Sequence, residues 1–552
     1  MKSNNFKKIN WKRLFYNIFI GKTVARKLFM FYLYAIVFGV VFLSLPISLK
    51  RNGMAVLVDG TEKPYQFVHG LFVSISAFTD TGLSTVNVLS TYNIFGQFII
   101  LFLIQIGGLG LFTLYWMLWT VLFNNIIYKK IKRYPIHEKI GIGFSNSLII
   151  ASERGDTKLG LSIRAIKSAV LFILTTEFIF MVIYALFFYF VPSYQQVDAQ
   201  TINTSLAANT WYVDGSDYNY FYKNVGYSIW AGLFQSVSTM NNAGFDIISQ
   251  ASYSPFRNGI WTIFLYISMI QIVIGGIGYP VIYDVIEFFR QKHHRQKFKF
   301  SLFTKVSSIT YLIILLVGIA FIFGFEFGIQ GNGLIANVNN NAYLSDHYFG
   351  NGKVRTWNEI TSLIYNVVSS RSAGLSTFSQ SEMSYASIWL INILMFIGCA
   401  PSSTGGGIRT TTLAIIFMTL VSYMRGFKGT VIFKKTIPNK TVVNSSIIIL
   451  TSLIMVLLFS FISYPLMINL DPHTSLTISD VLFEMSSAYG TVGLSTGLSA
   501  MLNSNSVSSY IIIILLCVIM IVGQLGISTS IFVFRSKESN QIITYPKESI
   551  RI

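Results

Sequence analysis

The segment SISAFTDTGLST at residues 74–85 has three related copies further along this chain. They are SVSTMNNAGFDI at 236–247, VVSSRSAGLSTF at 367–378 and MSSAYGTVGLST at 485–496. The four segments align on one glycine each: Gly82, Gly244, Gly374 and Gly493. The copies lie far apart in the chain, so whole structural units repeat rather than short tandem motifs. Four such loops, each ending a short helical run at a glycine, are predicted to surround one axis.

The composition is that of a membrane protein. Of the 552 residues, 53% are hydrophobic and only 11% are charged, whereas soluble domains carry about 25% charged residues. Apolar runs close to the roughly 20 residues that a membrane helix needs recur along the whole chain. They cover residues 28–49, 95–123, 169–191, 260–289, 307–327, 387–424, 442–470 and 509–534. We therefore expect an all-α membrane protein with eight spans and a glycine loop between the two spans of each pair.

The repeats divide the chain into six parts. Residues 1–27 form a basic N-terminus and residues 536–552 a short tail, both expected in the cytoplasm. The repeats are expected at residues 28–135, 136–300, 301–435 and 436–535. Each repeat has the order membrane helix, pore loop, membrane helix, and the four are predicted to surround one central pore.

The net charge of +19 is explained by where the basic residues lie relative to the membrane spans. Basic residues gather near residues 7–13, 129–133, 290–299 and 425–435, which fall on one side if the spans alternate. This is the positive-inside pattern of membrane proteins. It predicts a multi-pass protein with both termini in the cytoplasm and lipid as its surroundings, and it argues against a nucleic-acid partner.

The loop segments are too short and too polar to cross a bilayer. Non-helical backbone at membrane depth occurs where it is buried in protein or lines a wet cavity. A half-helix running inward directs its negative C-terminal end at a cation. Glycine tolerates positive φ, which lets successive carbonyl groups point at the axis and replace the water shell of a potassium ion. The alternative is that these glycines only allow close helix packing.

The second helix of the third unit is interrupted. Its sequence contains Pro401, Ser402, Ser403, Thr404, Gly405, Gly406 and Gly407. A proline followed by three glycines is not expected to continue a helix. We interpret this segment as a flexible loop that lies beneath the four glycine loops, which form the ion filter, and acts as a gate. The alternative is a kinked helix whose backbone groups are satisfied locally.

The chain resembles the Trk/Ktr/HKT superfamily of potassium transporters, and within it the bacterial KtrB type. The residues that carry the resemblance are NAGFD at 242–246, SRSAG at 370–374, FE at 483–484, YGTVGLSTG at 489–497 and the interrupted segment at 401–412. The resemblance implies four repeats around a central pore, a homodimer, and a cytoplasmic ring of KtrA-like RCK subunits that bind nucleotide. It also implies potassium as the transported ion, a bacterial plasma membrane location and no bound cofactor in this chain.

By the same resemblance, the ion is bound by backbone carbonyls around and just before each glycine. Carried over to this chain, the filter consists of Asp80, Thr81, Gly82, Asn242, Ala243, Gly244, Ser372, Ala373, Gly374, Thr491, Val492 and Gly493. One departure concerns the last helix, where the family usually has an arginine that acts as a barrier together with the interrupted segment of unit three. This chain has Gln524 there, so the charge on which that barrier depends is absent from this position. Arg409 is the one candidate to replace this charge, but it matches a basic position that the family already has besides the arginine of the last helix.

Charged residues inside apolar spans are candidates for function. Glu177 is expected to pair with a neighbouring helix. Asp80 and Asp246 flank the filter and either concentrate cations at its mouth or cap the loop. Arg371 and Glu484 are expected to support the filter as a buried ion pair, because an unpaired cation would repel the transported ion.

Other functions are less compatible with the sequence. A proton-coupled carrier or a membrane enzyme needs paired carboxylates or histidines at membrane depth, which this chain almost lacks, so no enzymatic activity is expected. A non-conducting subunit would not need all four glycines. The sequence therefore predicts potassium-selective uptake, and the alternative is a sodium-permeable or proton-coupled carrier of the same fold.

Overall fold

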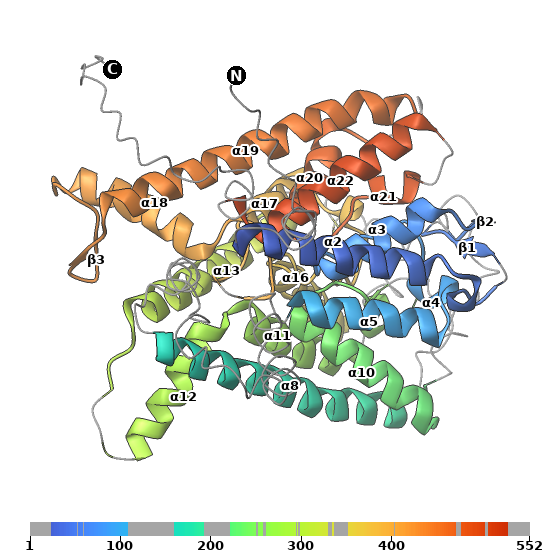
Figure 1. The fold of residues 1–552 in the computed structure, drawn as a ribbon, viewed down its shortest axis with the longest axis horizontal. Helices are drawn as coiled ribbons and strands as arrows, with labels where there is room; N and C mark the ends of the chain where they lie inside the picture. Colours follow the sequence, from blue (N-terminus) through green and yellow to red (C-terminus); the bar gives the residue numbers. More distant parts are fainter. Residues whose placement is uncertain are drawn as a thin grey trace, which may run out of the picture.

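The structure is a computed structural model (Figure 1). It describes residues 24–51, 53–58, 60–108, 159–191, 221–249, 252–257, 261–293, 295, 298–328, 334–335, 352–401, 403–470, 476–502 and 506–527. Helices dominate these residues, and the only strands among them form two short hairpins. The four predicted units are present, and in each of them a long first helix is followed by a shorter pore helix and a second helix.

The first helices are long and lie on the outside. They are α2 (Val24–Leu43), α8 (Leu159–Phe190), α13 (Leu302–Gly328) and α19 (Asn439–Ile468). Large apolar side chains on them are exposed, such as Phe178 (63%), Leu316 (55%) and Phe461 (72%). Extensive exposed apolar surface marks contact with a membrane or with another protein, and in a chain of this composition it is the surface expected to face lipid.

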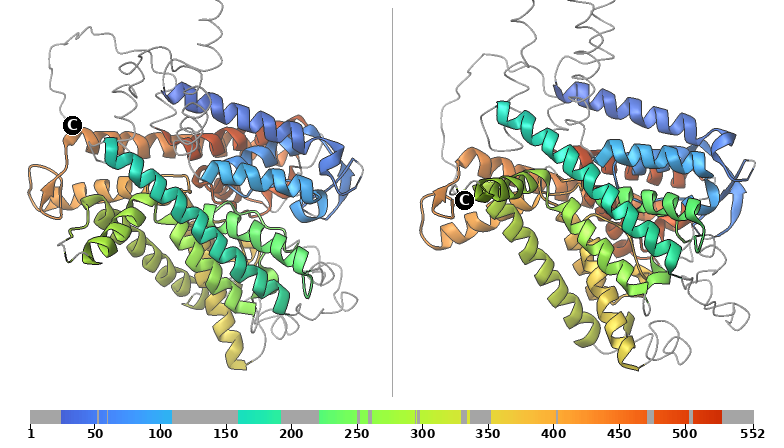
Figure 2. Two further views of the ribbon diagram at one scale, coloured as in Figure 1. Left: turned by 60° about the horizontal axis from the view of Figure 1, so that its bottom comes forward. Right: turned by 90° about the horizontal axis from the view of Figure 1, so that it is seen from below.

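The pore helices lie inside the ring of first helices. They are α3 (Phe67–Phe78), α10 (Val225–Asn241), α16 (Gly352–Ser369) and α20 (Ile478–Gly490). Each packs against the second helix of the preceding unit: α10 against α5 (Ile94–Gly108), α16 against α11 (Thr262–Gly276) and α20 against α17 (Tyr385–Phe396). The first, α3, packs against α22 (Val507–Leu525) of the last unit, which closes the ring. The predicted arrangement of four repeats around one centre is therefore confirmed (Figures 1 and 2).

Among the described residues, four helices are long and apolar enough to cross a membrane, or five if one bent pair counts as a single span. The pair is α11 and α12 (Tyr279–His293), which meet at 96°. The prediction of one continuous span at residues 260–289 is therefore wrong. The chain turns at Gly278, whose φ of +85° suits glycine. A Cβ there would lie 2.7 Å from the carbonyl oxygen of Pro401, so the bend packs directly against the interrupted segment of unit three.

The predicted helix break in unit three is confirmed. Helix α17 ends at Phe396 and α18 (Thr410–Met424) begins after an irregular segment, residues 397–409, which we call the gate loop. An isolated parallel bridge between Ile397 and Ile408 closes the base of this loop. Of its predicted residues, Ser402 lies outside the described part of the chain.

The two ends of the molecule differ. One end carries the hairpin of β1 (Met54–Val56) and β2 (Glu62–Pro64) with α4 (Val88–Thr91), and the opposite end carries α12 and the hairpin of β3 (Val431–Ile432) and β4 (Lys435–Thr436) (Figure 1). Short helices complete the fold: η1 (Pro46–Ser48), η5 (Ser254–Phe256), η7 (Gln380–Glu382) and α21 (Leu498–Met501).

Some predicted parts of the chain lie outside the described residues. They are the repeat boundary at 135/136, the first 23 residues and the tail after residue 527. The predicted repeat boundaries stay predictions.

Candidate functional site

Each pore helix ends in a loop held by the same type of backbone hydrogen bond. In units one, two and four, the amide before the glycine donates to a serine carbonyl in the last turn of the helix. These bonds are Thr81 N to Ser76 O (2.9 Å), Ala243 N to Ser238 O (2.8 Å) and Val492 N to Ser487 O (2.9 Å). The serines that the sequence alignment matched therefore give three of the four loops a common turn.

Unit three makes a turn that is one residue shorter, with a serine that the alignment missed. Ala373 N donates to the carbonyl oxygen of Ser369, at 2.8 Å. The Ser369 hydroxyl also donates to the carbonyl oxygen of Leu375, as the Ser238 hydroxyl does to Phe245 in unit two, both at 2.5 Å. A gap-free alignment compares Val368 with the other serines, and only a one-residue shift would have identified Ser369.

The four aligned glycines form a closed ring. All have positive φ, at +84° for Gly82, +72° for Gly244, +66° for Gly374 and +98° for Gly493. A Cβ on each glycine would meet the carbonyl oxygen of the residue before the glycine in the next unit. The partners are Ala243, Ala373, Val492 and Thr81 in turn, the last closing the circle. At Gly82 the separation would be 2.8 Å, which is closer than side chains approach. A side chain at any of these positions is excluded twice, by φ and by a neighbouring carbonyl.

On one side of this ring, the residues two positions before each glycine surround the tip of the gate loop. Asn242 Nδ2 donates to Thr404 Oγ1 (3.2 Å), and Gly406 N donates to Thr491 Oγ1 (2.7 Å). A Cβ on Gly405 would collide with the Ser372 hydroxyl. The fourth such residue is Asp80, whose Oδ2 accepts from Gln524 Nε2 at 3.4 Å; the same Gln524 nitrogen lies 3.4 Å from the carbonyl oxygen of Thr404.

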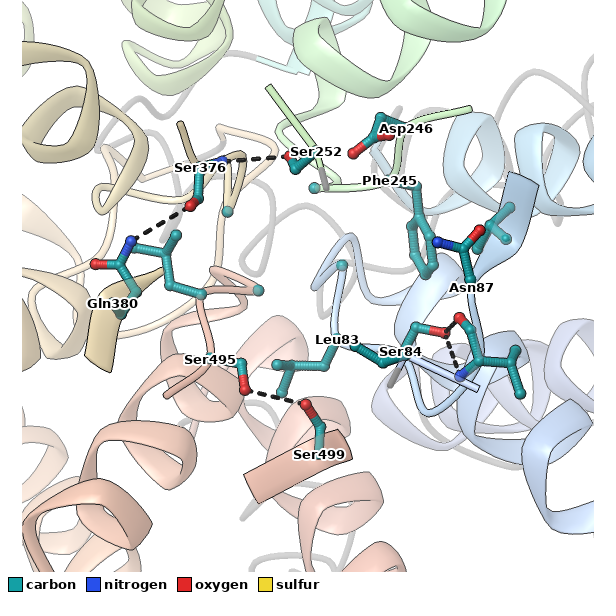
Figure 3. A pocket seen from close by; sticks show the side chains of 18 of the residues that line it. Leu83, Ser84, Asn87, Phe245, Asp246, Ser252, Ser376, Gln380, Ser495 and Ser499 are labelled. Atoms are coloured by element: carbon teal, nitrogen blue, oxygen red, sulfur yellow. Dashed lines mark hydrogen bonds between the residues drawn. The ribbon is translucent and has the colours of Figure 1, made fainter. Parts of the chain in front are cut away.

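On the other side, a vestibule opens toward the end with β1, β2 and α4. Residues from all four loops line it, and Figure 3 shows them facing a common centre. They include the four glycines, Ser84, Asp246, Ser376 and Ser495. Of the two aspartates expected beside the filter, Asp246 lines the vestibule, whereas Asp80 is fully buried on the gate-loop side.

The predicted ion pair between Arg371 and Glu484 is wrong. The Arg371 guanidinium is fully buried and donates to three carbonyl oxygens, those of Leu394 (3.0 Å), Ile397 (2.5 Å) and Gly398 (2.8 Å). Glu484 Oε1 accepts from Ser495 Oγ (3.1 Å) and Ser499 N (3.0 Å). Each charge is thus matched by neutral dipoles: Arg371 holds the start of the gate loop, and Glu484 holds the chain that follows Gly493.

The prediction that Glu177 pairs with neighbouring helices is confirmed. Its Oε1 accepts from Gln105 Nε2 on α5 (3.2 Å) and from Asn241 Nδ2 on α10 (3.1 Å). The carboxylate is buried, with 6% exposure, and ties three helices together near the end of the second pore helix. This residue therefore stabilises the contact between units one and two.

Similar proteins are found by sequence and by structure. The TrkH family profile, described as cation transport protein, matches residues 43–545. The uncharacterised cation transporter MG322 of Mycoplasma genitalium is 34% identical over 99% of this chain and 98% of its own length. The Ktr system potassium uptake protein D of Bacillus subtilis is 29% identical over 96% of this chain and 97% of its own length.

The fold itself matches a solved structure. The crystal structure of the potassium transporter TrkH from Vibrio parahaemolyticus superimposes with a TM-score of 0.59, at 14% identity, over 93% of this chain and 85% of that one. A likeness at this identity concerns the fold alone. Together with the family profile, which spans most of the sequence, it identifies a multi-pass membrane protein. The chain belongs to the TrkH family of cation transport proteins, within the Trk/Ktr superfamily.

Proposed function

We propose that this protein takes up potassium selectively through the ring of four loops. The observation that carries the proposal is the closed circle in which each glycine abuts the carbonyl oxygen of the next unit. Carbonyl oxygens arranged in this way replace the hydration shell of an alkali cation. The ion contacts are the backbone carbonyls of the filter residues named above, and the negative ends of the four pore helices add a favourable field. The relative from Bacillus subtilis carries potassium uptake in its name.

The gate loop is proposed to control this pathway. Its tip, from Thr404 to Gly406, contacts residues of units two and four by hydrogen bonds that are 3.2 and 2.7 Å long. A segment in this position obstructs an ion that has passed the ring. Three consecutive glycines lower the free energy needed to move the gate loop, because glycine has the widest range of backbone conformations.

The proposed orientation places the vestibule outside the cell. The end opposite the vestibule carries Arg290, Lys292, Lys434 and Lys435 on α12 and around β3 and β4, and basic loops favour the cytoplasm. We place the protein in a bacterial plasma membrane with both termini inside the cell. A homodimer and a cytoplasmic KtrA-like nucleotide-binding ring are proposed from the family resemblance, and the name of the Ktr system relative supports a multi-component system.

The second candidate is a sodium-permeable carrier of the same fold. The vestibule is lined by hydroxyl groups and the Asp246 carboxylate, which attract any cation and do not distinguish sodium from potassium. Only the ring of carbonyls provides that distinction in the leading proposal. The two candidates therefore differ in ion ranking and not in the presence of flux.

The test is expression in a bacterium that lacks its own potassium uptake systems, on medium with limiting potassium. Growth is expected for the wild-type chain. Rb⁺ uptake into vesicles that contain the purified protein then gives the ion ranking, by competition with KCl and NaCl. Competition by K⁺ but not by Na⁺ supports the leading proposal, and equal competition supports the second candidate. Absence of both growth and uptake contradicts both.

A further inference from the structure

A carboxylate lies on the gate-loop side of the ring of glycines, and it has no ion-pair partner among the described residues. Asp80 is fully buried in the interior of a membrane protein. Among the described residues, the ion pairs are Arg51 with Glu62 and Arg290 with Glu287, so none involves Asp80. An ionisable side chain at membrane depth is costly to bury and usually marks an ion path or a binding site.

Three carboxylate or amide oxygen atoms on residues around the gate-loop tip are buried without a hydrogen-bond donor in the described structure. They are Asp80 Oδ1, Asn242 Oδ1 and Gln524 Oε1. In each case the other polar atom of the same group is engaged: Gln524 Nε2 contacts Asp80 Oδ2 and the Thr404 carbonyl, and Asn242 Nδ2 contacts Thr404 Oγ1. Buried acceptors are rarely left unsatisfied, since each costs about 1–3 kcal/mol. These three belong to side chains linked through one residue, Thr404, and through Gln524, so a single cation could satisfy them together.

Two basic residues of the described chain reach the gate loop, and both donate to backbone carbonyls rather than to Asp80. Arg371 donates to the carbonyls of Leu394, Ile397 and Gly398. Arg409 donates to the carbonyl oxygen of Gly405, on the gate loop itself. The last helix provides the neutral Gln524 beside Asp80. Within the described part of the chain, the side chain that contacts the Asp80 carboxylate is thus the neutral amide of Gln524, which brings no compensating charge.

We propose that Asp80, Asn242 and Gln524 form an inner binding site for a monovalent cation, between the carbonyl ring and the gate loop. This inference rests on the proposed function, because its ion is one that has passed the ring. One carboxylate with neutral oxygens suits a singly charged hard cation such as K⁺, Rb⁺ or Na⁺. Protein sites for Ca²⁺ use more carboxylate ligands, and no cluster of three His, Cys, Asp or Glu side chains occurs among the described residues.

The site also gives Gln524 a role. Its amide nitrogen bridges the Asp80 carboxylate and the gate-loop carbonyl of Thr404, so its amide oxygen is left free for the cation. Occupancy of the inner site and the position of the gate loop are then coupled through one side chain. A cationic residue at position 524 would instead neutralise Asp80 and occupy the site.

The test uses the full chain in vesicles, with Rb⁺ uptake as the readout and KCl and NaCl as competitors. Asp80→Asn keeps the size of the side chain and removes its charge. We expect the Rb⁺ concentration for half-maximal uptake to rise at least about tenfold, with the preference for K⁺ over Na⁺ unchanged. The matched control is Glu326→Gln: this carboxylate is also buried, but it accepts from Leu334 N and Ser384 N, away from the loops. It is expected to leave the half-maximal concentration unchanged.

A second variant covers the case in which Asp80→Asn does not fold. Gln524→Glu adds a second carboxylate and is expected to make Rb⁺ uptake sensitive to block by CaCl₂, to which the wild type is less sensitive. Unchanged half-maximal concentration in Asp80→Asn, or unchanged Ca²⁺ sensitivity in Gln524→Glu, overturns the inner site while wild-type uptake leaves the proposed function intact. Loss of the K⁺ preference in Asp80→Asn also overturns it, since Asp80 would then act in the filter. Wild-type vesicles without Rb⁺ uptake overturn the proposed function together with this site.

Discussion

Arg371 Nη2 donates a 2.8 Å hydrogen bond to the carbonyl oxygen of Gly398, and this bond joins the third filter loop to the start of the gate loop. The same guanidinium holds the carbonyls of Leu394 and Ile397, at the end of α17. The last carbonyls of a helix have no partner within the helix, and a cation there is favourable. One side chain therefore links the ring of glycine loops to the gate loop.

Replacing Arg371 is expected to destabilise the protein strongly. Arg371→Met removes the donors of three buried carbonyl groups, at a cost of about 3 kcal/mol or more. The measurement is the melting temperature of the detergent-solubilised chain. Arg371→Lys, which keeps the charge but not the fork of donors, should lie between Met and the wild type. A Met variant as stable as the wild type would contradict this role of Arg371.

Glu484 is expected to support the ring through hydrogen bonding rather than through charge. Glu484→Gln keeps the oxygen that accepts from Ser495 and Ser499, whereas Glu484→Ala removes it. Loss of these bonds in the interior costs about 1–3 kcal/mol and loosens the chain after Gly493. We predict that the Ala variant loses most of its K⁺ preference in Rb⁺ uptake competition and that the Gln variant retains it. Equal loss in both variants would mean that the negative charge itself is needed.

Removal of the gate loop is expected to change the rate of transport and not its selectivity. Deletion of residues 401–407 takes away the tip that contacts Asn242 and Thr491, while the carbonyl ring is untouched. We predict faster Rb⁺ uptake with the same ranking of K⁺ and Na⁺. Unchanged uptake in a deletion variant that is folded and inserted would contradict the assignment of this loop as a gate.

The bend in unit two should also position the gate loop. Gly278→Ala introduces a Cβ 2.7 Å from the Pro401 carbonyl oxygen at a residue with positive φ, which costs about 1–2 kcal/mol for the backbone alone. We expect a lower melting temperature and altered Rb⁺ uptake. Gly324→Ala is the control, because nothing lies within 4 Å of the Cβ at this position on α13. If the two variants behave alike, the contact between the bend and the gate loop has no importance.

The sequence predicts the repeated parts of this structure well. Four aligned glycines with polar residues before them are enough to predict four loops, because positive φ and close approach of backbones both require glycine. The helix break at residues 401–407 follows from proline and consecutive glycines. The bend at Gly278 was missed because residues 260–289 were assessed by their apolar length alone. Gly275, Gly276, Gly278 and Pro280 lie close together in that run and are the signal of a break.

The partners of buried side chains were harder to predict. The expected pairing of Arg371 with Glu484 assumed that opposite charges in neighbouring loops meet. Each instead finds backbone groups within its own unit, Arg371 at the end of α17 and Glu484 at Ser499. The two aspartates beside the filter were treated alike, although their positions relative to the glycine differ. Asp80, two residues before Gly82, lies on the gate-loop side, and Asp246, two residues after Gly244, lines the vestibule.

The most direct measurement compares the ion ranking of Rb⁺ uptake in wild-type vesicles with that in Gly374→Ser. The added side chain would fall on the carbonyl oxygen of Val492 and break the circle at one point. Gly324→Ser is the matched control, since the same residue change occurs there in open space. We predict strong K⁺ preference in the wild type and the control, and a weakened or lost preference in Gly374→Ser. A Gly374→Ser protein that transports with the wild-type ranking would contradict the claim that this ring of carbonyls selects the ion.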